Sequence, residues 1–168
     1  MTAPNSPDDK HDVPTRIVLV EDEPALRDNY TLALSRAGFD ISGFADAQSA
    51  LVSVKARLPD MAIIDIGLGR DSEAGFELCR ELREVSSRLP IIFLSARDSE
   101  LDIISGLRLG ADDYLTKDIS LVHLIARVNT LLRRVEAFSA PRQRHLLERS
   151  GFWSYTLNDW LPNGASSL

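Results

Sequence analysis

The chain has 168 residues, 44% of them hydrophobic, so it can bury a sizeable core but is short for two full domains. Its formal net charge of -6 excludes a nucleic-acid-binding polycation. The single cysteine, Cys79, excludes an intrachain disulfide, which fits a reducing compartment. The sequence shows no apolar run near the roughly 20 residues that span a bilayer, and its polar start has no signal-peptide pattern. We therefore expect a cytoplasmic protein without membrane contact.

A regular alternation of strands and helices begins after residue 14. Residues 1–14 are polar and contain prolines, so we predict that they form a disordered lead. Residues 17–20 are apolar and mostly β-branched, which is typical of a buried strand. Pro24 suits the first position of the helix that follows, and Gly38 suits its end.

Four further strand and helix pairs continue this alternation. The strands are predicted at residues 41–44, 61–64, 91–94 and 114–115. The helices are predicted at residues 46–58, 76–85, 98–109 and 120–134. Suitable first caps are Asp46, either Asp98 or Ser99, and Ser120, while Pro59 and Gly110 end helices.

These elements predict an α/β fold. Strands that are apolar throughout, without alternation, indicate burial on both faces of a sheet. Helices of about 10–15 residues between them predict parallel strands joined by right-handed crossovers. We therefore expect a doubly wound (βα)5 sandwich of three layers around a central five-stranded parallel sheet. In such folds the site lies at the carboxyl ends of the strands.

Polar side chains follow four of the five predicted strands. Glu21 and Asp22 follow the first strand, Asp65 follows the third, Ser95 ends the fourth, and Lys117 follows the fifth. One acidic residue after a strand is usually a solvated loop residue or a helix cap. The conjunction at four strand ends predicts one shared site at the edge of the sheet.

Three carboxylates at one edge repel one another unless a cation joins them. Mg²⁺ prefers oxygen ligands, and a phosphoryl group could then bridge such a cation and Asp65. A carboxylate nucleophile gives an acyl phosphate. The glycine-rich loops of dinucleotide-binding folds and P-loops are absent after the first strand. An aspartate-nucleophile phosphatase usually has a second Asp where this chain has Gly67.

The chain resembles the receiver domains of two-component response regulators. The matching stretches are IVLVEDEPALR, MAIIDIGL, LPIIFLSARDSE and GLRLGADDYLTK, within about residues 15–137. Asp65 precedes Ser95 by 30 residues and Lys117 by 52, as the family pattern requires. The resemblance implies a flavodoxin-like, CheY-like fold with Asp65 as phosphoacceptor for a sensor histidine kinase. Such receivers are not enzymes but phosphoacceptors with at most slow self-dephosphorylation.

The resemblance also implies roles for the other site residues. Mg²⁺ (or Mn²⁺) is held by Glu21, Asp22 and Asp65 with the Gly67 carbonyl. Lys117 neutralises a phosphoryl oxygen, and the hydroxyl of Ser95 binds another. Ser95 and the aromatic Tyr114 form the switch.

GLRLGADDYLTK followed by an arginine-ended helix is similar to the OmpR/PhoB branch. In that branch active receivers form homodimers through the face made by the fourth helix, fifth strand and fifth helix. The resemblance implies that acidic residues pair with arginines across this face. The candidates are Asp112 and Asp113 with Arg127, Arg133 and Arg134.

The chain departs from the family pattern at two places. Asp118 follows Lys117 where most receivers have a proline with a cis bond. We predict either a trans bond with a shifted loop or a strained cis bond. The loop after Asp65 is about two residues longer than usual, with Gly69 at the usual proline position and the family glycine displaced to Gly75. It either alters partner choice and cation binding or is an indifferent surface insertion.

Residues 138–168 are predicted to be a linker and a truncated or added tail. In the OmpR/PhoB branch a DNA-binding domain would follow the linker, and we expect it to be absent from this chain, so that DNA is contacted only through that missing domain. The alternative is a stand-alone receiver that acts through protein contacts, as in chemotaxis or phosphorelays. A third reading is a receiver that has lost phosphoacceptance, which the intact acidic set argues against and Asp118 keeps open.

Overall fold

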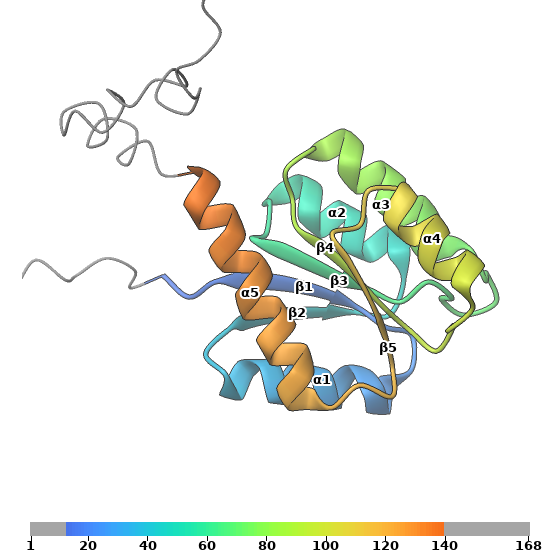
Figure 1. Ribbon diagram of the computed structural model, residues 1–168, viewed down its shortest axis with the longest axis horizontal. Coiled ribbons are helices and arrows are strands. Elements are labelled where there is room, and N and C mark those ends of the chain that lie inside the picture. Colours follow the sequence, from blue (N-terminus) through green and yellow to red (C-terminus); the bar gives the residue numbers. More distant parts are fainter. Residues whose placement is uncertain (1–12, 140–168) are drawn as a thin grey trace, which may run out of the picture. The chain divides into compact units, whose positions relative to one another are not determined.

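The computed structural model describes residues 13–139, in which strands and helices alternate as predicted (Figure 1). Most of the predicted lead and almost all of the predicted tail lie outside the described residues, so the division at residues 14 and 138 stays a prediction. The strands are β1 (Arg16–Val20), β2 (Asp40–Phe44), β3 (Met61–Ile64), β4 (Ile91–Ser95) and β5 (Asp113–Thr116). The helices are α1 (Pro24–Arg36), α2 (Ala47–Ala56), α3 (Ala74–Val85), α4 (Glu100–Arg108) and α5 (Leu121–Ser139).

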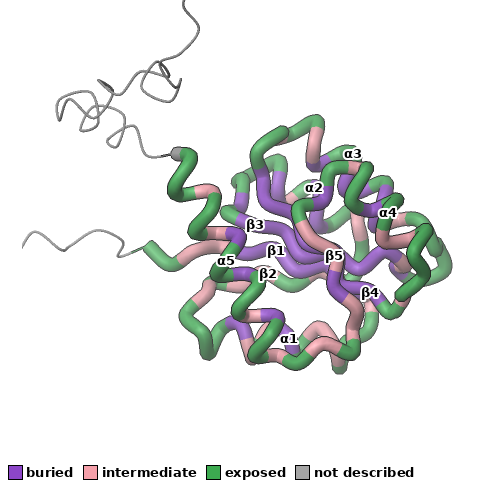
Figure 2. Tube along the Cα trace, in the orientation of Figure 1, coloured by how far each residue is buried: buried purple, intermediate pink, exposed green. Residues whose placement is uncertain are grey.

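The five strands form one parallel sheet in the order β2-β1-β3-β4-β5. Helices α1 and α5 cover one face, and α2, α3 and α4 cover the other (Figure 1). Two buried apolar clusters, one for each face, fill the spaces between these layers. Strands β3 and β4 are buried throughout, while the edge strands β2 and β5 are mostly half-buried (Figure 2). The predicted doubly wound (βα)5 sandwich is confirmed.

The helix boundaries follow local backbone chemistry. Asp46 caps α2, its carboxylate accepting a hydrogen bond from the Ser49 amide at 2.8 Å. Ser99 rather than Asp98 caps α4. The prediction that α2 continues to Leu58 is wrong, because the helix ends at Ala56 and Leu58 is 50% exposed. A residue that precedes a proline disfavours the helical conformation, so the helix stops before it.

Helix α4 packs differently from what its apolar residues suggest. Leu101, Ile104 and Leu107 share one helical stripe, and they are 78%, 43% and 44% exposed. The buried residue of α4 is Gly106. A Cβ atom there would lie 3.0 Å from both the Phe93 and the Tyr114 rings, so this glycine lets the helix approach the sheet. An apolar stripe is therefore left facing outwards.

Candidate functional site

Three carboxylates meet at the carboxyl edge of the sheet, as predicted. Glu21 and Asp22 follow β1, Asp65 follows β3, and one carboxylate oxygen of each lies within 4.8 Å of the others. Backbone hydrogen bonds continue past the strands and fix this edge, since the Glu21 amide donates to Phe44 O and the Asp65 amide to Val20 O, both at 2.9 Å. Glu21 is 2% exposed and Asp65 is 7% exposed. Two of the three acids are therefore buried against each other.

Lys117 places one ammonium group between two of these carboxylates. Its Nζ lies 2.7 Å from Glu21 Oε2 and 2.7 Å from Asp65 Oδ2. The Lys117 amide donates to Ser95 O at 2.9 Å, which sets the lysine beside β4. Burial works to lower the pKa of Lys117, but the hydrogen bonds and charges of Asp65 and Glu21 outweigh it and raise that pKa. The lysine is therefore held in its charged form.

One ammonium does not balance three carboxylates. Burial raises the pKa of Glu21, and the hydrogen bond and charge of Lys117 offset this only in part. The remaining negative charge, together with three convergent oxygen ligands, fits a hard divalent cation such as Mg²⁺ or Mn²⁺. The Gly67 carbonyl is the fourth predicted ligand, and its role stays a prediction.

The lengthened loop after Asp65 folds into a tight turn beside the acids. Leu68 and Asp71 form an isolated antiparallel bridge, with amide to carbonyl distances of 3.0 and 3.2 Å. Gly69 has φ +65° in this turn, a conformation that suits glycine. Its amide donates to Asp22 Oδ2 at 2.9 Å, so the turn touches the acidic cluster directly.

Gly75 lies against the backbone of the acceptor residue. A Cβ atom at Gly75 would be 2.1 Å from Asp65 O and 2.5 Å from the Cα atom of Ile66. The Gly75 amide donates to Ile66 O at 2.7 Å. Only glycine allows α3 to begin this close to the end of β3. This contact supplies a physical reason for a glycine at residue 75, the position to which the family glycine is displaced in the sequence.

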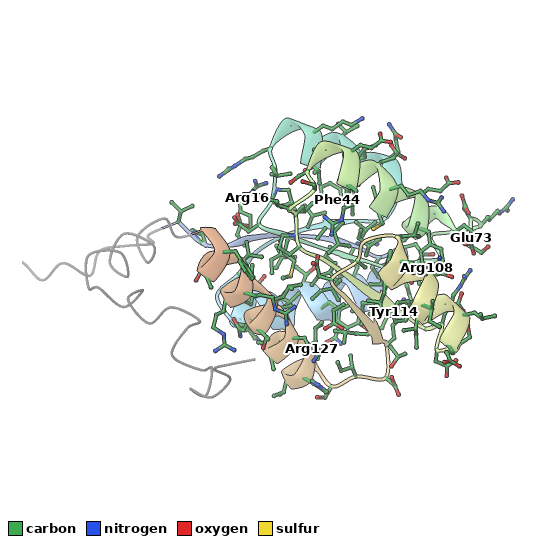
Figure 3. The ribbon with its side chains drawn as sticks, turned by 45° about the horizontal axis from the view of Figure 1, so that its top comes forward. Arg16, Phe44, Glu73, Arg108, Tyr114 and Arg127 are labelled. Atoms are coloured by element: carbon green, nitrogen blue, oxygen red, sulfur yellow. The ribbon has the colours of Figure 1, made fainter. Side chains whose placement is uncertain are left out.

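Ser95 and Tyr114 lie on neighbouring strands at the same edge. Ser95 is 1% exposed, and its hydroxyl oxygen accepts a hydrogen bond from the Arg97 amide at 3.3 Å. The Tyr114 hydroxyl donates to Arg97 O at 2.8 Å, and its ring centroid lies 6.1 Å from that of Phe93. Burial raises the pKa of Tyr114. The side chain of Tyr114 reaches from β5 towards α4 (Figure 3).

The departure at Asp118 has a defined structure. None of the peptide bonds in residues 13–139 is cis, so the trans alternative for the Lys117–Asp118 bond is the one observed. The Thr116 hydroxyl donates a hydrogen bond to the Asp118 carboxylate. Asp118 is exposed, and a cavity of about 310 Å³ beside it is lined by Ala96, Asp98, Thr116, Lys117 and Asp118. The Asp118 carboxylate thus engages Thr116, while Lys117 binds the acidic cluster.

Four of the five residues predicted for a dimer face have partners within the chain. Arg127 Nε binds Asp113 Oδ2 at 2.7 Å. The Asp112 carboxylate accepts hydrogen bonds from Arg83 at 3.1 Å and from the Ile91 amide at 2.9 Å. Arg133 and Arg134 are exposed, with Arg133 3.4 Å from the Thr130 hydroxyl. Pairing of these residues across a dimer face stays a prediction.

Two arginines with many partners, Arg83 and Arg97, were not singled out from the sequence. Arg97 follows Ser95 by two residues. It contacts Asp102, Tyr114 and the loop that follows Asp65. Arg83 contacts Leu89, Gly110 and Asp112 at the opposite end of the sheet. The sequence signal was the position of Arg97 inside the matched stretch LPIIFLSARDSE. An arginine at a loop is otherwise too common to single out.

Comparisons with known proteins agree with this geometry. The family model for the response regulator receiver domain matches residues 17–129. The transcriptional regulatory protein CreB of Escherichia coli is 44% identical over 123 residues, which cover 73% of this chain and 53% of CreB. The transcriptional regulatory protein TrcR of Mycobacterium tuberculosis is 41% identical over 133 residues, 79% of this chain and 51% of TrcR.

Solved structures share the same fold. The BeF3-activated receiver domain of Klebsiella pneumoniae RstA is 32% identical with a TM-score of 0.65, covering 71% of this chain and 99% of that one. A response regulator from Chloroflexus aurantiacus is 30% identical with a TM-score of 0.67, and the match covers 72% of this chain and 99% of that one.

The chain therefore belongs to the response regulator receiver domain family of two-component systems. Its curated relatives are named as transcriptional regulatory proteins, in line with the expected OmpR/PhoB-type branch. The chain spans about half the length of these relatives. Among the helices that the structure describes, none has the length and apolar character needed to cross a membrane.

Proposed function

We infer that Asp65 accepts a phosphoryl group from a phosphohistidine of a sensor histidine kinase. The observation that carries this inference is the pairing of buried Asp65 with Lys117 at 2.7 Å beside the acidic pair Glu21 and Asp22. In the transfer, an Asp65 carboxylate oxygen bonds to phosphorus while the bond from phosphorus to the histidine nitrogen breaks, and the imidazole leaves with its electron pair. The product is an acyl phosphate on Asp65.

The side chains around Asp65 divide the work of positioning and charge neutralisation. A divalent cation, when bound by Glu21, Asp22 and Asp65, neutralises charge on the phosphoryl oxygens. Lys117 binds a second phosphoryl oxygen, because its ammonium already lies beside Asp65. The hydroxyl of Ser95 donates to a third, since Ser95 ends β4 at the same edge of the sheet as Asp65. Phosphoryl transfer depends on such positioning and neutralisation.

The chain acts in this proposal as a cytoplasmic signalling module and not as a turnover enzyme. It takes up one phosphoryl group and loses it at most slowly by hydrolysis. Phosphorylation adds charge and acceptor oxygens that draw Ser95 towards Asp65, and Tyr114 responds in the space beside it. The resulting shift in population reshapes the face of α4, β5 and α5.

We further propose that this face controls dimerisation and, through a DNA-binding domain, transcription. The match covers only about half of each relative named as a transcriptional regulator, which supports the second part. The exposed stripe of Leu101, Ile104 and Leu107 supports the first, because large apolar side chains left outward often mark interaction surfaces. Asp113 and Arg127 on β5 and α5 would exchange their mutual pair for pairs across the dimer.

Incubation with acetyl phosphate and Mg²⁺, followed by intact-mass measurement, tests phosphoacceptance. We expect the wild-type chain to gain the mass of one phosphoryl group and Asp65→Asn to gain none. Asp28→Asn is the matched control, because Asp28 is an exposed aspartate of α1 and should leave the mass gain unchanged. An unmodified wild-type chain, or equal modification of Asp65→Asn, would exclude the proposal.

A further inference from the structure

Arg97 joins three separate parts of the molecule. Its guanidinium donates to Ser72 O at 2.6 Å and to Glu73 Oε1 at 3.0 Å, both in the loop after Asp65. The same group donates to Asp102 Oδ1 of α4 at 3.2 Å. The Arg97 carbonyl accepts the hydrogen bond of the Tyr114 hydroxyl at 2.8 Å. Arginine suits this position because its planar fork binds several acceptors at once.

The loop that Arg97 binds also reaches the acidic cluster. The turn of Leu68 and Asp71 presents the Gly69 amide to the Asp22 carboxylate at 2.9 Å. Asp71 Oδ1 then accepts a hydrogen bond from the Glu73 amide at 2.9 Å, which stiffens the stretch between turn and α3. The loop of residues 67–73 therefore contacts Asp22 near its middle and Arg97 at its end.

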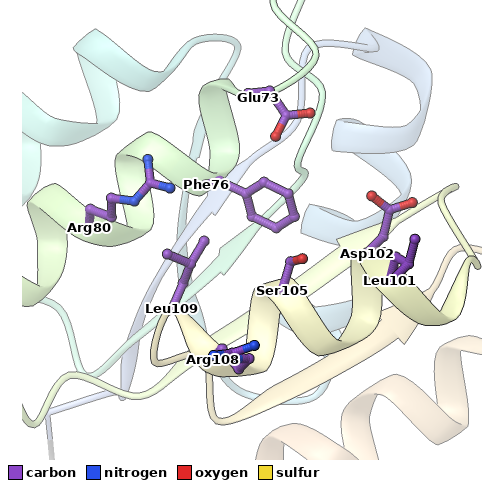
Figure 4. Close-up of a pocket in the computed structure, with 8 residues that line it drawn as sticks. All are labelled: Glu73, Phe76, Arg80, Leu101, Asp102, Ser105, Arg108 and Leu109. Atoms are coloured by element: carbon purple, nitrogen blue, oxygen red, sulfur yellow. The ribbon is translucent and has the colours of Figure 1, made fainter.

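On the other side, Arg97 contacts the first turn of α4. Asp102 binds Arg97 and also takes part in the helix cap, since its amide donates to the Ser99 hydroxyl oxygen at 3.1 Å and its carboxylate binds that hydroxyl at 2.6 Å. Glu73 and Asp102 lie at one end of a groove of about 410 Å³ between α3 and α4 (Figure 4). Without Arg97 these two acids would face each other as like charges. Arg97 thus bridges the two acids at that end of the groove.

We propose that Arg97 is a positioning residue that ties the loop of residues 67–73 to the first turn of α4 and to Tyr114. A change at Asp22 and Asp65 then reaches α4 through this side chain as well as through Ser95. The inference rests on the proposed function, because it names the route by which phosphorylation of Asp65 moves α4. A side chain with only a local role would stabilise each contact separately and would not make the two segments respond together.

Hydrogen exchange on the unphosphorylated chain gives the first test. Arg97→Gln should speed amide exchange in residues 67–73 and in the first turn of α4 together, by about two- to thirtyfold. Arg97→Lys keeps the charge without the fork and should give a smaller change in both segments. Arg80→Gln is the matched control: Arg80 lines the same groove and has no ion pair among residues 13–139, so both segments should exchange as in wild type.

Hydrogen exchange after acetyl phosphate treatment gives the second test, with intact mass recorded on the same samples. We expect Arg97→Gln to take up the phosphoryl group and to lose most of the phosphorylation-dependent change in α4 exchange that wild type shows. The inference is overturned if phosphorylated Arg97→Gln shows the full wild-type change in α4. It is also overturned if Arg97→Gln alters exchange in only one of the two segments. If the wild-type chain gains no mass, the proposed function is excluded instead. The intact-mass measurement reports this outcome separately from the exchange data.

Discussion

Arg83 and Arg97 lie at opposite ends of the β-sheet and bind different kinds of partner. Arg83, at the amino end, donates to the backbone carbonyls of Ser86, Leu89 and Gly110 and to the Asp112 carboxylate. Arg97, at the carboxyl end, binds one carbonyl and two carboxylates on separate segments. The carbonyls that Arg83 binds are fixed by the backbone next to the ends of α3 and α4 and before β4, whereas the carboxylates that Arg97 binds are on side chains with rotatable bonds.

The same contrast holds for charge. The carboxyl end holds Glu21, Asp22 and Asp65 against one lysine, and burial raises the pKa of Glu21. At the amino end, Arg83 pairs with Asp112, which also accepts the Ile91 amide. One end of the sheet has its charges paired, whereas the other keeps an excess of negative charge, as the proposed binding of a cation requires.

The largest loss of stability is expected where a new side chain would clash with the backbone at the carboxyl end of the sheet. Gly75→Ala places a Cβ atom 2.1 Å from Asp65 O and should lower the free energy of unfolding by about 3 kcal/mol. Urea denaturation measures this loss. Gly67→Ala is the steric control, since its Cβ atom would meet only Ser72 Cα at 4.0 Å. Equal stability of the two variants would show that α3 shifts freely away from β3.

Arg83→Met should separate stability from phosphoacceptance. The change removes the Arg83 donor from the Leu89 and Gly110 carbonyls and leaves the Asp112 carboxylate with the Ile91 amide, so we expect a loss of about 2 kcal/mol in unfolding free energy. Phosphorylation by acetyl phosphate should stay at the wild-type level. Arg80→Met, on the same helix, serves as the control for loss of an arginine from α3. If Arg83→Met lowered the phosphorylated fraction of folded protein, the two ends would not be independent.

A cation bound at the carboxyl end of the sheet should raise the free energy of unfolding of the domain. Mg²⁺ at about ten times its dissociation constant should add about 1.4 kcal/mol to the unfolding free energy of wild type. Asp22→Asn should abolish most of this gain, because it removes one of the three convergent carboxylates. Thermal unfolding with and without Mg²⁺ measures the gain. Asp60→Asn, remote from the cluster at the start of β3, should keep it, and an equal gain in Asp22→Asn would argue against this site.

The smallest expected effect is a pH-dependent increase in the free energy of unfolding for Glu21→Gln. The folded-state pKa of Glu21 is raised above 4.5, so its contribution to stability is fully present below pH 4.5 and is lost as pH rises through the raised value. Glutamine resembles the protonated form and does not lose that contribution. The variant should therefore be more stable than wild type near neutral pH without a cation, and the difference should shrink towards pH 4.5. Denaturation at several pH values checks the sign, and a gain that grows on acidification contradicts it.

Most of the fold was predictable because its signals are local and consistent. Apolar strands of four or five residues, helix caps such as Asp46 and the glycine at the end of α1 all agree with one topology. The meeting of Glu21, Asp22, Asp65 and Lys117 follows from parallel strands that share one edge. The structure brings together the acids and the lysine as predicted, while their chemical roles remain proposals.

What the sequence did not predict depends on side chains that meet over long separations. Arg97 reaches Ser72 and Glu73 across 25 and 24 residues, and Arg83 reaches Asp112 across 29. No periodicity encodes such contacts. The exposed stripe of α4 was likewise hidden, because apolar spacing gives a helical face without saying whether a neighbour covers it.

The sheet's two edges have a consequence for how such a molecule can assemble. Edge strand β2 contains exposed Asp40 and Gly43, and edge strand β5 has only four residues and begins with Asp113. Short edge strands and charged or glycine residues make poor templates for adding a further strand. The two edges of the sheet therefore resist irreversible growth into fibres, and any association of two copies would have to use the helices instead.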